Sequence, residues 1–194
     1  ARAFAMDVAD EGSIAAAFDA AESALGPIDT LVNNAGMNAR AMAVDLTADQ
    51  FDQIMGVNLR GPFLCAREAA RRMMARGEKQ GRIVNIASIG ALKVLPGLAA
   101  YCTSKAGLVM LTKALAREWA NRGINVNAVC PGYIVTELND AFFQEEAGKK
   151  LVAGFPRRRL MQESDLDDMM AFLCGARSAA VTGAVFTLDD GQTL

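Results

Sequence analysis

Short apolar runs alternate with long amphipathic stretches along this chain, and this alternation limits the fold more than any other feature. Five runs have the length and composition of strands: AFAMDV (3–8), IDTLVNNAG (28–36), GRIVNIAS (81–88), INVNAVCPG (124–132) and GAVFTLDDG (183–191). Nearly continuous apolar strands separated by helices are typical of a parallel sheet that helices cover on both faces. We therefore predict a single three-layer α/β domain over residues 1–194.

The stretches between these runs carry apolar residues at helical spacing. They predict helices over about 11–25, from Thr47 to about 76, over 99–121 and over 164–175. Thr47 and Gln50 have the spacing of a capping box, which fixes the start of the second helix. Residues 133–160 show no clear period and are expected to be irregular.

The composition narrows the chemistry that the chain can perform. It contains no histidine, and its 20 lysines and arginines nearly balance its 22 aspartates and glutamates. The lack of histidine excludes Ser-His-Asp hydrolysis, Cys-His proteolysis and most zinc chemistry, so we expect no metal site. A general acid or base must then be a carboxylate, a lysine, a cysteine or a tyrosine.

The charge and cysteine patterns also exclude several kinds of partner. Charges of both signs are spread along the chain, so no basic surface for nucleic acid is predicted. No apolar run approaches the roughly 20 residues of a membrane helix. The four cysteines (Cys65, Cys102, Cys130 and Cys174) show no CxxC spacing, and no signal-peptide pattern accompanies them. These features predict a cytoplasmic protein with reduced thiols, bound neither to nucleic acid nor to a membrane.

Three segments at the ends of predicted strands are rich in small or polar residues: 33–36, 87–90 and 131–132. In a parallel α/β sheet, ligands bind outside the carboxyl ends of the strands, and all three segments would open there. Any one of them has an ordinary explanation as a turn. Together, and with Tyr101 and Lys105 on the helix after the second segment, they predict a binding or catalytic site.

Tyr101 and Lys105 are four residues apart on a predicted helix, so they share one face. Ser88 stands thirteen residues before Tyr101 and completes the pattern Ser-x12-Tyr-x3-Lys. Five further segments occur in the order and spacing of a known family: NNAG (33–36), VNLRG (57–61), YCTSKAGL (101–108), INVNAVCPGYIVT (124–136) and DDGQTL (189–194). With them, the chain resembles the short-chain dehydrogenase/reductase family over essentially its whole length.

The resemblance implies a catalytic set of Asn58, Ser88, Tyr101 and Lys105. Tyr101 would exchange the substrate hydroxyl proton while hydride passes to or from a nicotinamide cofactor. A free tyrosine has a pKa of about 10, and the Lys105 ammonium is expected to lower it. Ser88 would hold the substrate oxygen, and Asn58 would anchor a water in a proton relay. The alternative for Asn58 is a buried amide that satisfies helix backbone.

The same resemblance implies NAD or NADP as the cofactor. The residues that would contact it are Asp7, Val8, Asn33, Ala35, Gly36, Tyr101, Lys105, Pro131, Gly132, Ile134 and Thr136. Asp7 and Val8 match an adenine-side contact, and the alternative for Asp7 is a helix cap or a solvated strand end. The choice between NAD and NADP depends mainly on the end of the family's second strand and on its glycine-rich turn, which this sequence does not show.

The family begins with a strand, a TGxxxGxG turn and a helix that binds pyrophosphate, and the sequence contains no such segment. The resemblance therefore implies a Rossmann-like doubly wound parallel sheet in which strands 1 and 2 are absent. The run 3–8 would lack a neighbour, and the strand at 28–36 would leave an open apolar edge. We hypothesise that this N-terminally incomplete domain belongs to a longer polypeptide. An intact mass matching these 194 residues alone would contradict the hypothesis.

We expect an oxidoreductase that interconverts a secondary alcohol and a ketone on a small molecule, namely a sugar, polyol or sugar acid. The segment 123–140 is similar to gluconate 5-dehydrogenase-like members, and 3-oxoacyl-[acyl-carrier-protein] reductases are nearly as similar. A further hypothesis is a non-catalytic binding scaffold. Family members are commonly tetramers, so a homo-oligomer (tetramer or dimer) is expected. The resemblance implies that the helices 47–76 and 99–121 pack across one interface and the last strand across another. Candidate residues for these surfaces are Met73, Met74, Met110 and Trp119, and the alternative for each is a place in the core.

Two regions near the end of the chain refine this hypothesis. The segment 137–160 corresponds to the family's substrate lid, and its phenylalanines, among them Phe142 and Phe155, mix with charges. Asp190 stands where the family usually has glycine. A left-handed turn there would tolerate aspartate less well than glycine, so we expect a small local adjustment.

Overall fold

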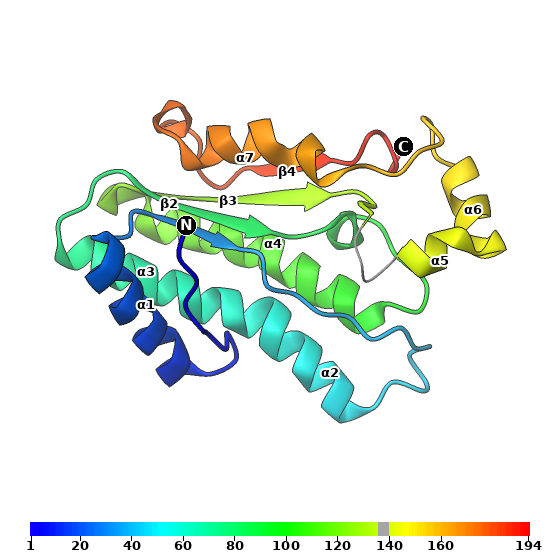
Figure 1. Ribbon diagram of the computed structural model, residues 1–194, viewed down its shortest axis with the longest axis horizontal. Coiled ribbons are helices and arrows are strands. Elements are labelled where there is room, and N and C mark those ends of the chain that lie inside the picture. Colours follow the sequence, from blue (N-terminus) through cyan, green and yellow to red (C-terminus); the bar gives the residue numbers. More distant parts are fainter. Residues whose placement is uncertain (136–139) are drawn as a thin grey trace.

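The computed structural model describes residues 1–135 and 140–194. Its four strands form one sheet in the order β1-β2-β3-β4, with every neighbouring pair parallel. The strands are β1 (Thr30–Asn33), β2 (Gly81–Ile86), β3 (Ile124–Pro131) and β4 (Val185–Leu188). The predicted α/β class with a parallel sheet is confirmed (Figure 1).

Helices precede the first strand and lie between successive strands along the chain. The α-helices are α1 (Glu11–Leu25), α2 (Ala48–Met55), α3 (Gly61–Ala75), α4 (Ala99–Trp119), α5 (Asp140–Gln144), α6 (Glu146–Ala153) and α7 (Asp167–Cys174). A π-helix, Gly56–Arg60, joins α2 to α3. Short 3-10 helices span Ile89–Ala91, Ala120–Arg122, Glu163–Leu166 and Ala176–Ser178.

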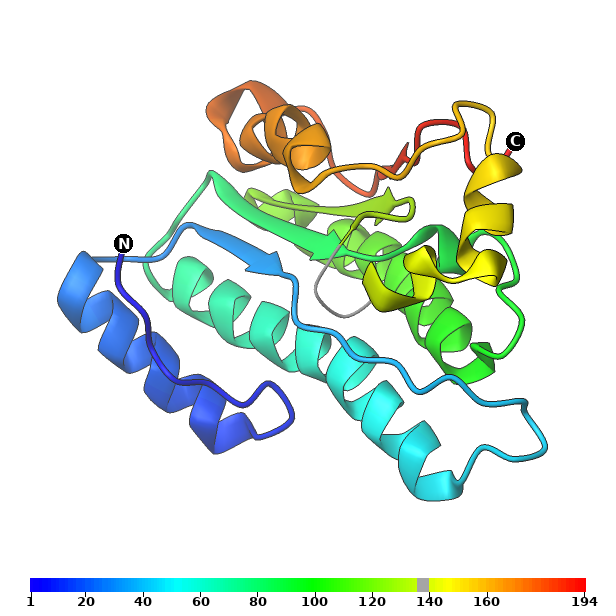
Figure 2. The ribbon, with the colours of Figure 1, turned by 45° about the vertical axis from the view of Figure 1, so that its right-hand side comes forward.

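Helices cover both faces of the sheet, as the apolar strands require. Helices α1, α3 and α4 lie on one face and α7 lies on the other (Figures 1 and 2). Successive strand residues point to opposite faces. Ile83 of β2 therefore packs in the cluster formed with α1, α3 and α4, whereas its neighbour Val84 packs with Leu173 of α7.

The predicted strand at 3–8 is wrong. Residues 1–7 have no regular secondary structure, and the Asp10 N–H donates to the Asp7 carbonyl at 3.1 Å in a turn that leads into α1. A strand needs a neighbour to complete its hydrogen bonds, and no described strand lies beside this segment. Val8 instead packs against Gly61 of α3.

The helix predicted from Thr47 begins as expected but is not continuous. The capping box is present, since the Gln50 N–H donates to Thr47 Oγ1 at 3.2 Å and the Thr47 N–H donates to Gln50 Oε1 at 3.1 Å. The π-helix then interrupts the helix before α3 begins. Pro62 explains the interruption, because it has no N–H to donate to the carbonyl of Asn58.

Two other predicted elements differ from the structure. The segment 133–160, expected to be irregular, contains the short helices α5 and α6. The helix predicted at 164–175 starts as a 3-10 turn, and its α-helical part begins at Asp167. Strand β1 has β2 as its one neighbour in the described sheet, so the predicted open edge is present, with Val32 39% exposed. Among the described helices, none is both long and apolar enough to cross a membrane.

Candidate active site

Three of the predicted catalytic side chains converge where β2 ends and α4 begins. Ser88 follows β2 and accepts a hydrogen bond from the Gly90 N–H at 3.0 Å. Tyr101 and Lys105 lie one turn apart near the start of α4. All three line a cavity of about 440 Å³ together with Gly132, which follows β3. The carboxyl ends of β2 and β3 therefore open on one site, as the sequence predicts.

Lys105 is buried, with only 4% of its surface exposed. Its Nζ donates to the carbonyl of Ile86 at 2.7 Å and lies 5.8 Å from the centroid of the Tyr101 ring. Burial disfavours the charged ammonium and lowers the pKa of Lys105 to about 8. Near pH 8 this lysine exchanges a proton far more readily than an exposed lysine would.

The expected lowering of the Tyr101 pKa is not observed. Burial of the phenol raises this pKa, and the hydrogen bond with Ser88 opposes the shift only in part. The Lys105 amine faces the tyrosine ring and is mostly charged at neutral pH, below its own pKa of about 8, but the raised pKa of Tyr101 shows that burial dominates. Tyr101 is therefore a protonated phenol at neutral pH.

Asn58 is completely buried in the π-helix, and its side chain is already engaged. Its Oδ1 accepts from the Met37 N–H at 2.8 Å, and its Nδ2 donates to the Met37 carbonyl at 2.8 Å and to Ser104 Oγ at 3.1 Å. Ser104 Oγ in turn donates to the Tyr101 carbonyl at 2.7 Å. Asn58 thus ties the loop after β1 to the helix that carries Tyr101. Its role as the anchor of a relay water stays a prediction.

The NNAG segment connects the sheet to the site. Asn33 Nδ2 donates to Asn85 Oδ1 at 2.8 Å, and Asn85 Nδ2 donates to Thr112 Oγ1 at 2.9 Å, so buried polar side chains join β1, β2 and α4. Gly36 borders the cavity, where an added Cβ would lie 3.5 Å from Lys105 Nζ. A side chain at Gly36 would therefore fill space beside this amine.

The segment after β3 lies against the last turn of the chain. Pro131 and Gly132 line the cavity that contains Lys105, and Ile134 lines a neighbouring one. A Cβ on Gly132 would lie 2.5 Å from Gln192 Oε1, so glycine allows this close approach. Thr136, also predicted as a cofactor contact, lies outside the described residues.

Four predicted cofactor contacts, Asp7, Val8, Asn33 and Ala35, are not among the residues that line the cavities of Ser88 and Tyr101. Asp7 is exposed, and its Oδ1 accepts from the Ala9 N–H at 2.9 Å, but the residue that caps α1 is Asp10. Val8 packs against α3, and Ala35 is exposed in the loop after β1. Cofactor binding by these residues stays a prediction.

A second cavity of about 580 Å³ shares Ser88, Tyr101 and Gly132 with the first. Its walls are mostly apolar and come from the loop after β1, the turn after Ser88, the loop 95–98, the start of α4, the segment after β3, and the helices α5 and α6. Aromatic side chains of α5, Phe142 and Phe143, border the cavity.

Sequence reasoning missed Arg40, which lines this second cavity. Its guanidinium carbon lies 5.1 Å from the centroid of the Phe142 ring, and its chain packs against Gly97, where an added Cβ would lie 3.5 Å from Arg40 Cγ. Among the lining residues that the structure describes, Arg40 is the one with a charged side chain. Its position four residues after NNAG, in a loop leaving the carboxyl edge, was the available signal.

The cavity around Lys105 fits the nicotinamide and ribose half of the predicted cofactor. An ammonium has three N–H donors, and Lys105 Nζ uses one of them on the Ile86 carbonyl, so donors remain for ribose hydroxyls. Gly36 and Gly132 leave room for a flat ring and a sugar beside the backbone. The residues present therefore suit NAD or NADP, which would supply the hydride donor or acceptor.

Comparison with known proteins gives matches along nearly the whole chain. A family model described as enoyl-(acyl carrier protein) reductase matches residues 1–193. Inactive 2-(S)-hydroxypropyl-CoM dehydrogenase 2 of Xanthobacter autotrophicus is 38% identical over 192 residues, which cover 96% of this chain and 83% of that protein. D-threitol dehydrogenase of Mycolicibacterium smegmatis is 37% identical over 193 residues, which cover 100% of this chain and 74% of that protein.

A solved structure shares both sequence and fold with this chain. It is a gluconate 5-dehydrogenase from Burkholderia cenocepacia in complex with NADP and tartrate, with a TM-score of 0.91 and 39% identity over 97% of this chain and 73% of that one. One relative is named inactive, but the matches as a group support an enzyme that uses NAD or NADP over a non-catalytic scaffold. The chain belongs to the short-chain dehydrogenase/reductase family of NAD(P)-dependent oxidoreductases.

Proposed function

We propose that this protein transfers hydride between NAD or NADP and a secondary alcohol or ketone of a sugar, polyol or sugar acid. The observation that carries the proposal is the border between the two cavities. Ser88 and Tyr101 line both of them, so a substrate in the larger cavity would meet a cofactor in the smaller one at these side chains. Relatives named for threitol and gluconate support this substrate class.

Each catalytic side chain has a separate task in ketone reduction. Tyr101 donates its phenolic proton to the carbonyl oxygen, and the Ser88 hydroxyl donates a hydrogen bond to the same oxygen. A bound nicotinamide cofactor would supply the hydride that reduces the carbonyl carbon. The raised pKa of Tyr101 keeps the phenol protonated at neutral pH, which suits the donor role. Alcohol oxidation requires Tyr101 to accept a proton and is therefore expected to speed up as the pH rises.

The Tyr101→Phe variant tests the proton transfer. It removes one hydroxyl from a buried ring, so the melting temperature should change little, while kcat should fall about 100- to 10,000-fold, the range of general acid catalysis. The measurement is steady-state NADH or NADPH oxidation with a panel of ketoses and keto acids.

The matched control is Tyr133→Phe, which removes the hydroxyl of the other tyrosine in the chain. Tyr133 borders the substrate cavity, so the Tyr133→Phe variant is expected to have a changed KM for substrate. Its kcat should stay within about tenfold of the wild-type value. Turnover by Tyr101→Phe at the wild-type rate would contradict the proposed role of Tyr101.

Arg40 favours a sugar acid over a neutral polyol as the substrate. A cation that borders a mostly apolar cavity can pair with a carboxylate, and none of the described ion pairs uses Arg40. Contacts with Phe142 and Gly97 hold the side chain at the wall of the cavity. A substrate with its carboxylate at Arg40 would extend along this cavity, which also contains Ser88 and Tyr101.

The Arg40→Gln variant tests this preference with one sugar acid and the polyol of the same chain length. Loss of a charged hydrogen bond should raise KM for the acid about 10- to 100-fold and leave KM for the polyol nearly unchanged. Arg122→Gln, an exposed site beyond the opposite end of α4, is the control. Equal effects on both substrates would contradict recognition of a carboxylate by Arg40.

A 3-oxoacyl-[acyl-carrier-protein] reductase is the second candidate function. Apolar side chains dominate the same cavity, among them Leu95, Leu98 and Leu151, and such a wall also suits an acyl chain. Assays with a 3-oxoacyl thioester decide between the two. A kcat/KM for the thioester well above that for every sugar acid would favour the reductase.

A further inference from the structure

The two strained backbone positions of the described chain meet at one place outside the catalytic set. Arg158 and Asp190 are the non-glycine residues with positive φ in the part that the structure describes, at 51° and 54°. This left-handed backbone disfavours residues with a Cβ, and its persistence at a particular site suggests a function. The left-handed turn expected at Asp190 is therefore present.

These strained residues lie in a cluster of ion pairs. Arg159 Nε lies 2.7 Å from Asp190 Oδ2, and Arg157 Nε lies 3.1 Å from Asp190 Oδ1. The Asp190 side chain is only 9% exposed, although the side chain of Arg157 is 69% exposed and that of Arg159 is 47% exposed. The guanidinium groups of Arg157 and Arg159 thus both pair with the Asp190 carboxylate. Arg158, which stands between these two arginines in the chain, has the left-handed backbone. We call this cluster of Arg157, Arg159 and Asp190 the arginine clamp.

One side of the clamp continues into the wall of the substrate cavity. Phe155, two residues before Arg157, is buried and stacks on Tyr133 with ring centroids 5.7 Å apart. Phe143 of α5 also contacts Tyr133, edge-on, with ring centroids 5.8 Å apart. Tyr133 and Phe143 both line the cavity that contains Tyr101. We call Tyr133, α5, α6 and Phe155 the substrate wall.

The other side of the clamp belongs to the turn after β4, which also supports the opposite end of the wall. Gln192 Oε1 accepts from the Tyr133 N–H at 2.7 Å. The Asp189 carboxylate shapes this turn by accepting from the Gly191 N–H at 3.0 Å and the Thr193 N–H at 2.8 Å. The turn therefore binds the substrate wall at both of its ends, at Tyr133 through Gln192 and beyond Phe155 through Asp190.

We infer that Asp190 is a positioning residue, which holds the substrate wall against the cavity through Arg157 and Arg159 and so sets the affinity for substrate without touching it. The inference rests on the proposed function at the same site. Glycine at 190 would relax the backbone but could not carry the carboxylate, which explains why a strained aspartate is present there.

Two substitutions of Asp190 test the inference in steady-state kinetics. Asp190→Gly relieves the strained backbone and Asp190→Asn retains a residue that tolerates it, while both remove the ion pairs. We expect KM for the substrate to rise about three- to tenfold in both variants, since partly exposed ion pairs are modest, and kcat to stay within about twofold. The wild-type KM should rise more steeply with added NaCl than the KM of either variant, because the variants lack the two ion pairs of Asp190.

The control is Arg158→Gly, which relieves strain at the neighbouring position but leaves both ion pairs in place. Its KM should equal that of the wild type. A purely structural role for Asp190 would instead lower the melting temperature of Asp190→Asn without a salt-dependent change in KM. An unchanged KM in both Asp190 variants, or an equal rise in Arg158→Gly, would overturn the inference.

Limited digestion with trypsin provides a readout that needs no substrate. Lys149 and Lys150 in α6 lie within the wall and are exposed, so their cleavage reports on how firmly the wall is held. Cleavage after these lysines should be faster in Asp190→Asn than in the wild type. If no substrate is turned over, the proposed function fails while digestion still decides the clamp, and equal digestion rates would overturn it.

Discussion

Burial of Lys105 lowers the stability of the fold and gives the site an amine with a lowered pKa. Its ammonium is buried beside a tyrosine ring, with the Ile86 carbonyl as its described acceptor. The fall of its pKa from 10.5 to about 8 corresponds to about 3 kcal/mol of destabilisation at neutral pH. A hydrophobic residue would pack there without that cost. The site therefore maintains a lysine that can titrate near physiological pH at the expense of stability.

The lowered pKa of Lys105 makes the free energy of unfolding depend on pH. The pKa of Lys105 is about 8 in the folded chain, whereas in the unfolded chain it takes the ordinary lysine value of 10.5. The unfolded state binds more protons between these values, so the contribution of Lys105 to stability increases as the pH rises through this window. Below the folded pKa both states are protonated and the full cost is present.

The Lys105→Met variant should lack this increase of stability with rising pH. The difference in free energy of unfolding between wild type and variant, from urea denaturation, should shift in favour of the wild type by about 2 to 3 kcal/mol between about pH 7.5 and 10. Lys113→Met, at an exposed position of the same helix, should show no such shift. A constant difference between wild type and Lys105→Met would contradict the depressed pKa.

At the scale of elements, the apolar runs and the spacing of capping residues correctly predicted four strands and the start of one helix. The apolar runs that became β1 to β4 each have a neighbour in the sheet, and the side-chain spacing of Thr47 and Gln50 formed the capping box. The run 3–8 has the same composition but no adjacent strand, so it forms none. A strand forms only where a neighbouring strand accepts and donates its backbone hydrogen bonds, and the composition of the run does not show whether such a neighbour is present.

The parts of the site that escaped prediction depend on contacts between distant segments. Ser88, Tyr101 and Lys105 could be predicted because strand ends and helical spacing place them, and because their order matches a family. Arg40 reaches the cavity through packing against Gly97, far along the chain. The ion pairs of Asp190 join residues more than thirty positions apart, and no periodicity marks them.

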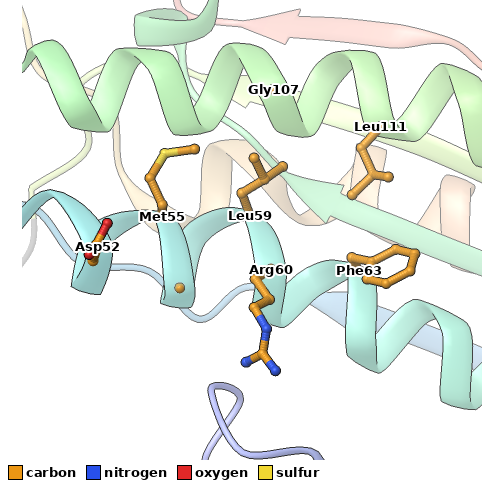
Figure 3. A pocket seen from close by; sticks show the side chains of 8 residues that line it. Asp52, Met55, Leu59, Arg60, Phe63, Gly107 and Leu111 are labelled. Carbon is orange, nitrogen blue, oxygen red and sulfur yellow. The ribbon is translucent and has the colours of Figure 1, made fainter.

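An open groove lies between α4 and the helices α2 and α3, away from the catalytic cavities. It measures about 670 Å³ and is lined mainly by apolar residues of α2, the π-helix, α3 and α4. Figure 3 shows Met55 and Leu59 pointing toward α4, with Phe63 and Leu111 farther along the groove. Met110, beside Leu111, is 64% exposed. Met73, another candidate for an oligomer surface, is completely buried and so follows its core alternative.

We expect this groove to pack against a second copy of the chain, since α2–α3 and α4 are the elements that the family resemblance implies at such an interface. Met110→Glu places a charge beside the groove without disturbing the core and should lower the mass measured by size-exclusion chromatography with light scattering. Leu25→Glu, at an exposed leucine of α1, should leave that mass unchanged. A monomeric wild type, or a Met110→Glu variant with the wild-type mass, would contradict the expected interface.

The parallel sheet also determines when the site can form. Each of its strand pairs joins segments with a helix between them, so the described sheet contains no hairpin that could pair early. Pairings of this kind close long loops before their contacts form, and they fold slowly. Strand β4 and the turn that holds Tyr133 are the last of these segments to leave the ribosome. A nascent chain would therefore carry its tyrosine and lysine for some time before the pocket around them closed, with the edge of β3 unpaired until translation of β4.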